Sequence, residues 1–268
     1  MRSFEALVAC GLVLGAVACG GKDASEIAPP TPPAPSSPGA TPSGPGATSP
    51  GGTTPGGTTP AASGIACVGV LEGGGLVAFD PAAPAPQLAP LGTRPDGAGS
   101  MSSFGIVGRE LLFCSDDGEV VRFDLDAKTT KGHGVECDAV TADATGVFVL
   151  SNERLLHFAS PDALGTGTPA KTFALRDEPS AIGTSAGGVL AAGGFEGVVV
   201  LDRATGKTSQ VTLGGGASAF GVSSLSERDG KTLVVSFGEG GVQVFDATGK
   251  LARTLFERES FEGIACAR

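Results

Sequence analysis

The sequence contains no tryptophan and no tyrosine, and only two histidines and one asparagine. Because sugar recognition commonly relies on stacking against Trp and Tyr rings, their absence disfavours a carbohydrate-binding role. Basic residues are also few, since 18 Lys and Arg stand against 28 Asp and Glu, for a formal net charge of −10. A nucleic-acid partner needs Lys and Arg to neutralise its phosphates, so this composition argues against one.

The first 18 residues have the features of a secretion signal. Arg2 supplies a positive start, an apolar stretch runs from Ala6 to Val17, and small residues precede Cys19. The stretch is too short to be an ordinary transmembrane helix. The sequence therefore predicts a signal peptide at residues 1–18 that directs the chain out of the cytoplasm.

The segment Ala16–Cys19 resembles the lipobox of bacterial lipoproteins, in which the cysteine becomes the acylated first residue of the mature chain. This resemblance implies lipidation at Cys19, which would anchor the protein to the membrane without a transmembrane segment. Leu7–Cys10 also fits the pattern, but cleavage there leaves almost no apolar region ahead of it. A plain signal peptide with an incidental cysteine is the other alternative. We expect a protein of the bacterial cell envelope that faces the periplasm or the cell surface.

Residues 19–63 have the composition of a linker. From Lys22 to Ser63 the sequence consists mainly of Pro, Gly, Ser, Thr and Ala, with eleven prolines between Pro29 and Pro60. Such a segment buries too little apolar surface to offset its ordering entropy, so we predict that it is disordered. Its prolines favour extended geometry, which would hold the following domain away from the lipid surface.

One pattern recurs five times in the rest of the chain: an apolar strand, a turn rich in Gly, Asp or Glu, and a second apolar strand that usually ends in Asp. The copies are residues 65–80, 110–124, 146–159, 188–202 and 232–246. Both faces of these strands are apolar, which suits sheets stacked against a neighbour on each side. With one strand before and one after each hairpin, each unit has the four strands of a propeller blade.

The first copy lacks the preceding strand. Residues 261–266 follow the fifth copy and could supply that strand. The sequence thus predicts an all-β domain at residues 64–268, a five-bladed β-propeller closed by the C-terminal strand. An open or differently closed β-sandwich is the alternative.

The segments GLVAFD, GVVVLDRATGK and GVQVFDATGK resemble the LVIVD and YVTN type of β-propeller repeat, and more loosely the quinoprotein repeat. The resemblance covers residue 65 to the C-terminus and implies the architecture. It implies little about function, because propellers host enzymes, receptors and scaffolds alike. The absence of Trp removes the WD dipeptide of WD40 repeats and departs from the quinoprotein pattern, so we assign no cofactor.

Four cysteines remain if Cys19 is acylated and the signal is removed. An even number in an oxidising compartment predicts two disulfides. Ring closure brings Cys67 beside Cys266, which leaves Cys114 with Cys137, although four cysteines allow three pairings. Four buried reduced thiols are the alternative. The spacings do not suit a zinc site.

Few side chains suggest catalysis. His157 alternates with apolar residues and is interpreted as structural, whereas His133 is predicted in an exposed turn. The Gly214–Gly216 run lacks the context of a phosphate loop. Asp116 and Asp117 could join a calcium site, but hairpin turn chemistry explains them as well. The strand-ending aspartates recur with the repeat, which indicates turn capping.

The sequence therefore favours a non-catalytic binding or scaffolding module over an enzyme, with no catalytic or metal-ligating residue assigned. We expect it to be anchored to the membrane through Cys19 and to use propeller loops to bind a protein or small ligand. The alternative is a propeller hydrolase of the lactonase or glycosidase type, with an acidic central site that could also hold a metal ion.

Overall fold

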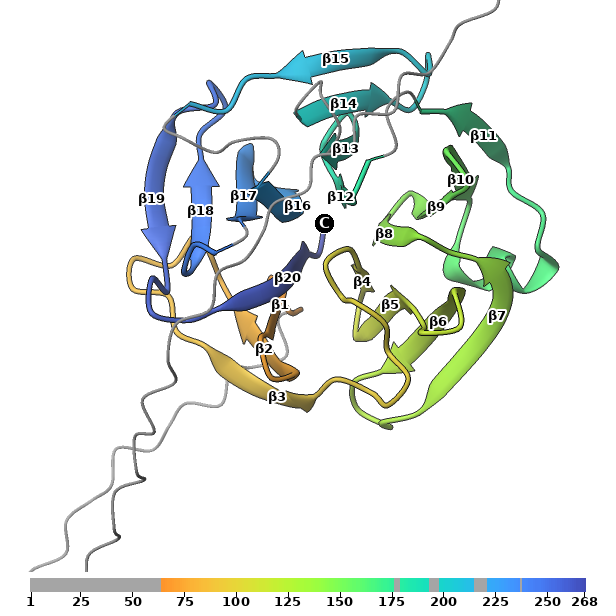
Figure 1. Cartoon of the computed structure of the whole chain (residues 1–268), viewed down its shortest axis with the longest axis horizontal. Coiled ribbons are helices and arrows are strands. Elements are labelled where there is room, and N and C mark those ends of the chain that lie inside the picture. Colours follow the sequence, from red (N-terminus) through yellow and green to blue (C-terminus); the bar gives the residue numbers. More distant parts are fainter. Residues whose placement is uncertain (1–63, 176–178, 193–197, 215–220, 237) are drawn as a thin grey trace, which may run out of the picture. The chain divides into compact units, whose positions relative to one another are not determined.

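We describe a computed structural model of the chain, covering residues 64–175, 179–192, 198–214, 221–236 and 238–268. The signal peptide, Cys19 and the linker lie outside the described residues. The described part is almost entirely β-structure, with five antiparallel four-stranded sheets arranged as blades around a central axis (Figure 1). Within these residues, no helix has both the length and the apolar character needed to cross a bilayer. The predicted five-bladed propeller is confirmed.

Each blade runs from an inner strand at the axis to an outer strand at the rim (Figure 1). Blade 1 contains β20 (Phe261–Cys266), β1 (Cys67–Leu71), β2 (Gly75–Phe79) and β3 (Ala89–Thr93). Blade 2 contains β4 (Gly105–Val107), β5 (Glu110–Cys114), β6 (Glu119–Asp124) and β7 (Thr130–Glu136). Blade 3 contains β8 (Ala139–Asp143), β9 (Gly146–Ser151), β10 (Arg154–Phe158) and β11 (Lys171–Ala174), with a 3-10 helix, η1 (Pro161–Thr166), before β11. Blade 4 contains β12 (Ala181–Thr184), β13 (Gly188–Ala192), β14 (Val198–Asp202) and β15 (Thr208–Val211). Blade 5 contains β16 (Val222–Arg228), β17 (Lys231–Ser236), β18 (Val242–Phe245) and β19 (Leu251–Leu255).

The C-terminal strand closes the ring as predicted. Strand β20 pairs antiparallel with β1, and Cys67 stands opposite Cys266 in the register. The first blade is therefore built from both ends of the domain, and β20 covers the edge of β1 that would otherwise be open.

In four blades an aspartate that ends or directly follows the third strand caps the following turn. A carboxylate oxygen accepts a hydrogen bond from the backbone N–H two residues further on, which is the geometry of an Asx turn. The pairs are Asp80 with Ala82 at 2.9 Å, Asp124 with Asp126 at 2.7 Å, Asp202 with Ala204 at 3.0 Å, and Asp246 with Thr248 at 2.8 Å. In blade 3, where Ala159 replaces the aspartate, Ser160 caps η1 instead.

The hydrophobic core lies between blades. One cluster joins Val68 and Leu76 of blade 1 to Phe104 and Phe113 of blade 2, and similar clusters fill the other four interfaces. Strands apolar on both faces are required for this arrangement, because each blade packs against two neighbours.

Small residues allow the inner strands to approach closely around the axis. A Cβ atom on Gly183 would lie 2.0 Å from the carbonyl oxygen of Leu225 in the next blade, so no larger residue fits there. Serine hydroxyls satisfy backbone donors on the unpaired edges of inner strands. Buried Ser103 accepts a hydrogen bond from the N–H of Ile182 at 3.0 Å, which links blade 2 to blade 4.

Candidate ligand-binding site at the mouth of the propeller

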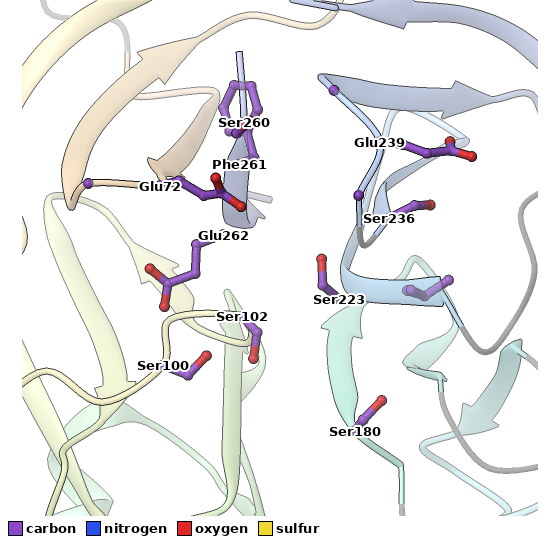
Figure 2. A pocket seen from close by; sticks show the side chains of 14 residues that line it. Glu72, Ser100, Ser102, Ser180, Ser223, Ser236, Glu239, Ser260, Phe261 and Glu262 are labelled. Carbon is purple, nitrogen blue, oxygen red and sulfur yellow. The ribbon is translucent and has the colours of Figure 1, made fainter. Parts of the chain in front are cut away.

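A cavity of about 550 Å³ opens at one end of the propeller axis (Figure 2). It is lined by loops and strand ends of blades 1, 2, 4 and 5, and its polar lining consists of three glutamates and six serines. These residues are Glu72, Glu239, Glu262, Ser100, Ser102, Ser180, Ser223, Ser236 and Ser260. The volume lies within the range typical of small-molecule sites.

The three glutamates reach the cavity from different elements. Glu72 lies in the turn between β1 and β2, Glu239 lies in the connection between β17 and β18, and Glu262 lies on β20. Figure 2 shows Glu72 and Glu262 on one side of the cavity and Glu239 on the opposite side. Because these turns and the start of the inner strand occur at the same end of each blade, ring closure gathers the three carboxylates.

Hydrogen bonds hold Glu262 in place. Its carboxylate accepts a bond from the backbone N–H of Met101 at 2.7 Å and forms an ion pair with Arg94 at 3.1 Å. This carboxylate therefore has a compensating cation, although Arg94 itself does not line the cavity.

A chain of buried amide and hydroxyl groups orients Glu239. Gln243 Nε2 donates to Glu239 Oε2 at 2.6 Å, and Ser236 Oγ donates to Gln243 Oε1 at 3.4 Å. Both Ser236 and Gln243 are only 9% exposed. The Glu239 carboxylate is therefore supported by a neutral amide, which does not offset its charge.

Glu72 is exposed, and its carboxylate has no hydrogen-bond or ion-pair partner within the part of the chain that the structure describes. Two of the three carboxylates at the mouth are thus uncompensated by a cation among the described residues.

Two of the lining serine hydroxyls, together with that of Ser236, present acceptors to the cavity. Ser223 Oγ donates its proton to the carbonyl oxygen of Val235 at 3.1 Å, and Ser180 Oγ donates to that of Ala192 at 3.3 Å. A hydroxyl has one proton and two lone pairs, so once its proton is donated it offers only lone pairs to a ligand.

Two disulfides, Cys67–Cys266 and Cys114–Cys137, form among the residues that the structure describes. The first joins β1 to β20 with Cα atoms 3.9 Å apart, and both of its cysteines are buried. The expectation of two disulfides is confirmed. They lie away from the cavity lining and are structural.

The two histidines also lie outside the cavity lining. His157 stacks on Phe148 with ring centroids 4.6 Å apart, in agreement with its interpretation as structural. The prediction of an exposed turn at His133 is wrong, because this residue lies within β7 and is half-buried. Its Nε2 atom is buried without a hydrogen-bond partner in the described residues.

The possible calcium ligands Asp116 and Asp117 lie in the turn between β5 and β6. Within the described ranges, no group of three His, Cys, Asp or Glu side chains is placed to hold a metal ion. Of the Gly214–Gly216 run, only Gly214 is among the described residues.

Sequence reasoning missed the mouth glutamates. Glu72 and Glu239 lie in the Gly- and Glu-rich turns of the first and fifth copies of the repeat, and Glu262 lies on the closing strand. Mapping all turns of the predicted propeller onto its two ends would have placed these acids together.

No protein-family model and no curated protein sequence matches the chain. Several solved structures resemble its fold at low sequence identity. A Bacteroides caccae protein of unknown function is 13% identical with a TM-score of 0.47, covering 74% of this chain and 84% of its own. A chain of a nidogen/laminin complex is 12% identical with a TM-score of 0.46, with the same coverage of 74% and 84%. Glutaminyl cyclase of Myxococcus xanthus is 13% identical with a TM-score of 0.46, covering 65% of this chain and 72% of its own.

Proposed function

We propose that this chain is an envelope-anchored, non-catalytic binding lipoprotein whose propeller mouth binds a protein or small ligand. The cavity at the mouth carries this proposal, because it combines the volume of a ligand site with a polar lining. In the proposal, acylated Cys19 anchors the protein and residues 19–63 tether the propeller.

The cysteines and the lining support this choice. Two disulfides in the propeller are consistent with an oxidising compartment outside the cytoplasm. A serine nucleophile needs an adjacent base, and neither His133 nor His157 reaches the cavity. The cavity therefore supports ligand binding better than acyl transfer by a serine nucleophile, which would need a base.

A pull-down from bacterial envelope extract tests the binding role. The full chain is immobilised as wild type and as Ser260→Trp, which places a bulky ring at an exposed position of the mouth. The matched control is Ser209→Trp, at an exposed position on the outer strand β15. We expect a partner captured by wild type and by Ser209→Trp but not by Ser260→Trp. Equal capture by all three would show that the mouth is not the binding site.

The three carboxylates at the mouth favour hydrolysis as the second candidate function. Acid and base roles in glycoside hydrolysis are taken by paired carboxylates, and such groups are supplied here by Glu72 and Glu262 of blade 1 and Glu239 of blade 5. Screening the full chain against lactones and glycosides, with Glu239→Gln as control, tests this candidate. Turnover that Glu239→Gln abolishes would favour it over simple binding.

A further inference from the structure

Three glutamates and three of the six lining serines offer hydrogen-bond acceptors to the mouth cavity. The hydroxyls of Ser180, Ser223 and Ser236 donate their protons to oxygens of the protein, so each presents lone pairs elsewhere. Carboxylates accept only. These six side chains favour a ligand that donates hydrogen bonds, while the hydroxyls of Ser100, Ser102 and Ser260 can donate as well as accept. The three carboxylates disfavour an anionic ligand.

The negative charge of the residues that line the mouth cavity favours a positively charged ligand. The described residues of the lining include three glutamates and no Lys, Arg or His. Arg94 compensates Glu262 from outside the lining, but Glu72 and Glu239 have no such partner in the described ranges. An ammonium group is both positively charged and donor-only, so it matches the wall in charge and in hydrogen bonding.

The positions of the carboxylates favour an extended cation over a metal ion. Glu239 lies across the cavity from Glu72 and Glu262 (Figure 2), and the described residues contain no group of side chains that could hold a metal ion. Val222 and Phe261 are the apolar members of the lining, and an aliphatic segment could contact them. A chain with an ammonium group at each end would place one charge on each side.

We propose that the mouth cavity binds a linear aliphatic cation carrying at least two ammonium groups. This inference rests on the proposed binding function and names its ligand class. The buried pair Ser236 and Gln243 positions the Glu239 carboxylate to accept one ammonium group, and Glu72 accepts the other together with Glu262. The amine is either a free polyamine or a lysine side chain of a partner protein.

Isothermal titration calorimetry of the full chain with spermidine at low ionic strength tests the ligand class. The variants are Glu239→Gln and Glu72→Gln, with Glu153→Gln as the matched control. Glu153 is an exposed glutamate in the corresponding turn of blade 3 and lies outside the cavity lining. We expect saturable binding at one site, weakened about tenfold by each mouth variant because one charge-assisted hydrogen bond is lost. The control should match wild type within about twofold.

Three results would overturn the inference. One is the absence of saturable binding of spermidine to wild type. Another is an equal loss in Glu153→Gln, which would indicate general attraction to an acidic surface. The third is binding of Ca²⁺ that depends on Glu239 and resists spermidine, which would assign the carboxylates to a metal.

The pull-down separates this inference from the proposed function. If Ser260→Trp abolishes capture of a partner but spermidine does not bind, the binding role stands and the ligand class is wrong. If spermidine binds and releases the captured partner, the amine is a lysine of that partner. If spermidine binds and no partner is captured, the ligand is the free polyamine. If neither binding nor capture occurs, both proposals fail.

Discussion

Ser224 lies at the propeller axis, where inner strands have one edge without a neighbouring strand. Its hydroxyl accepts a hydrogen bond from the backbone N–H of Ile264 at 3.0 Å, and the side chain is fully buried. We predict that Ser224→Ala lowers the free energy of unfolding by about 1–3 kcal/mol, since a buried N–H loses its acceptor. Urea unfolding of the purified chain measures this loss.

The control for Ser224 is Ser209→Ala, at an exposed position of β15, which should change the free energy of unfolding by less than about 0.5 kcal/mol. A Ser224→Ala variant as stable as wild type would mean that the N–H of Ile264 finds another acceptor.

We predict that His133 makes stability depend on pH near neutrality. Burial lowers the pKa of His133 below its ordinary value of 6.5, and the nearby charges of Lys131 and Arg122 lower it further, against the opposing effect of Asp162 and Glu110. The folded protein therefore holds this proton less tightly than the unfolded chain, so stability falls as the pH drops below about 6.5.

Replacing His133 by Gln should flatten the pH dependence between about pH 7.5 and 5.5, a range in which ordinary carboxylates stay ionised. Thermal unfolding midpoints of wild type and His133→Gln at several pH values test this. A slope that is the same in both proteins would assign the pH dependence to other groups.

Arg203 connects two blades at the scale of whole elements. It follows β14 of blade 4 and forms an ion pair with Asp143 of β8 in blade 3, whose side chain is only 3% exposed. The guanidinium also donates to the carbonyl oxygens of Ser185 and Gly188, at 2.9 and 3.0 Å, and lies over the ring of Phe148 at 5.0 Å. The Arg203 side chain thus links the turn between β12 and β13 of blade 4 to the inner strand β8 of blade 3.

We predict that Arg203→Met lowers the free energy of unfolding by about 3–5 kcal/mol, because it leaves the buried carboxylate of Asp143 without its cation. The double variant Asp143→Leu with Arg203→Met should lose less, since no charge is then buried alone. Guanidinium unfolding of both variants provides the comparison, and a double variant less stable than the single one would contradict this reasoning.

The blades could be predicted because their pattern is local and repeated. Hairpins such as residues 110–124 combine apolar strands with turn residues, and strand-ending aspartates such as Asp124 mark where each third strand stops. Segments that depart from the repeat could not be predicted from it. Where Ala159 stands in place of Asp, the chain forms η1, which no periodic pattern indicates.

The mouth site could not be predicted in the same way, because it depends on contacts between distant segments. Glu262 and Arg94 are 168 residues apart, and the ion pair exists only once β20 joins β1. Similarly, the orientation of Glu239 depends on its hydrogen bond with Gln243. In the sequence, Gln243 is only a polar residue within an apolar strand, and nothing indicates its partner. Side-chain contacts of this kind form only in the folded ring, and no periodic pattern in the sequence predicts them.

At the scale of the whole molecule, the two disulfides constrain very different loops. Cys67 and Cys266 are separated by 199 residues and join the ends of the propeller, whereas Cys114 and Cys137 are separated by 23 within one part of the ring. In the chain-entropy model, closing the longer loop removes more freedom from the unfolded state. The ring-closing bond should therefore contribute about 5 kcal/mol and the shorter bond about 3 kcal/mol.

Paired Cys→Ala variants, one for each bond, test this difference by urea unfolding. The four cysteines of these two bonds are buried, at 8% exposed or less, so the cost of the lost sulfur atoms is similar in the two variants. The variant lacking Cys67–Cys266 should be less stable by about 2 kcal/mol than the variant lacking Cys114–Cys137. If the order is reversed, β20 is held mainly by its strand pairing and by inner-strand contacts such as Ser224, and the disulfide is secondary to them.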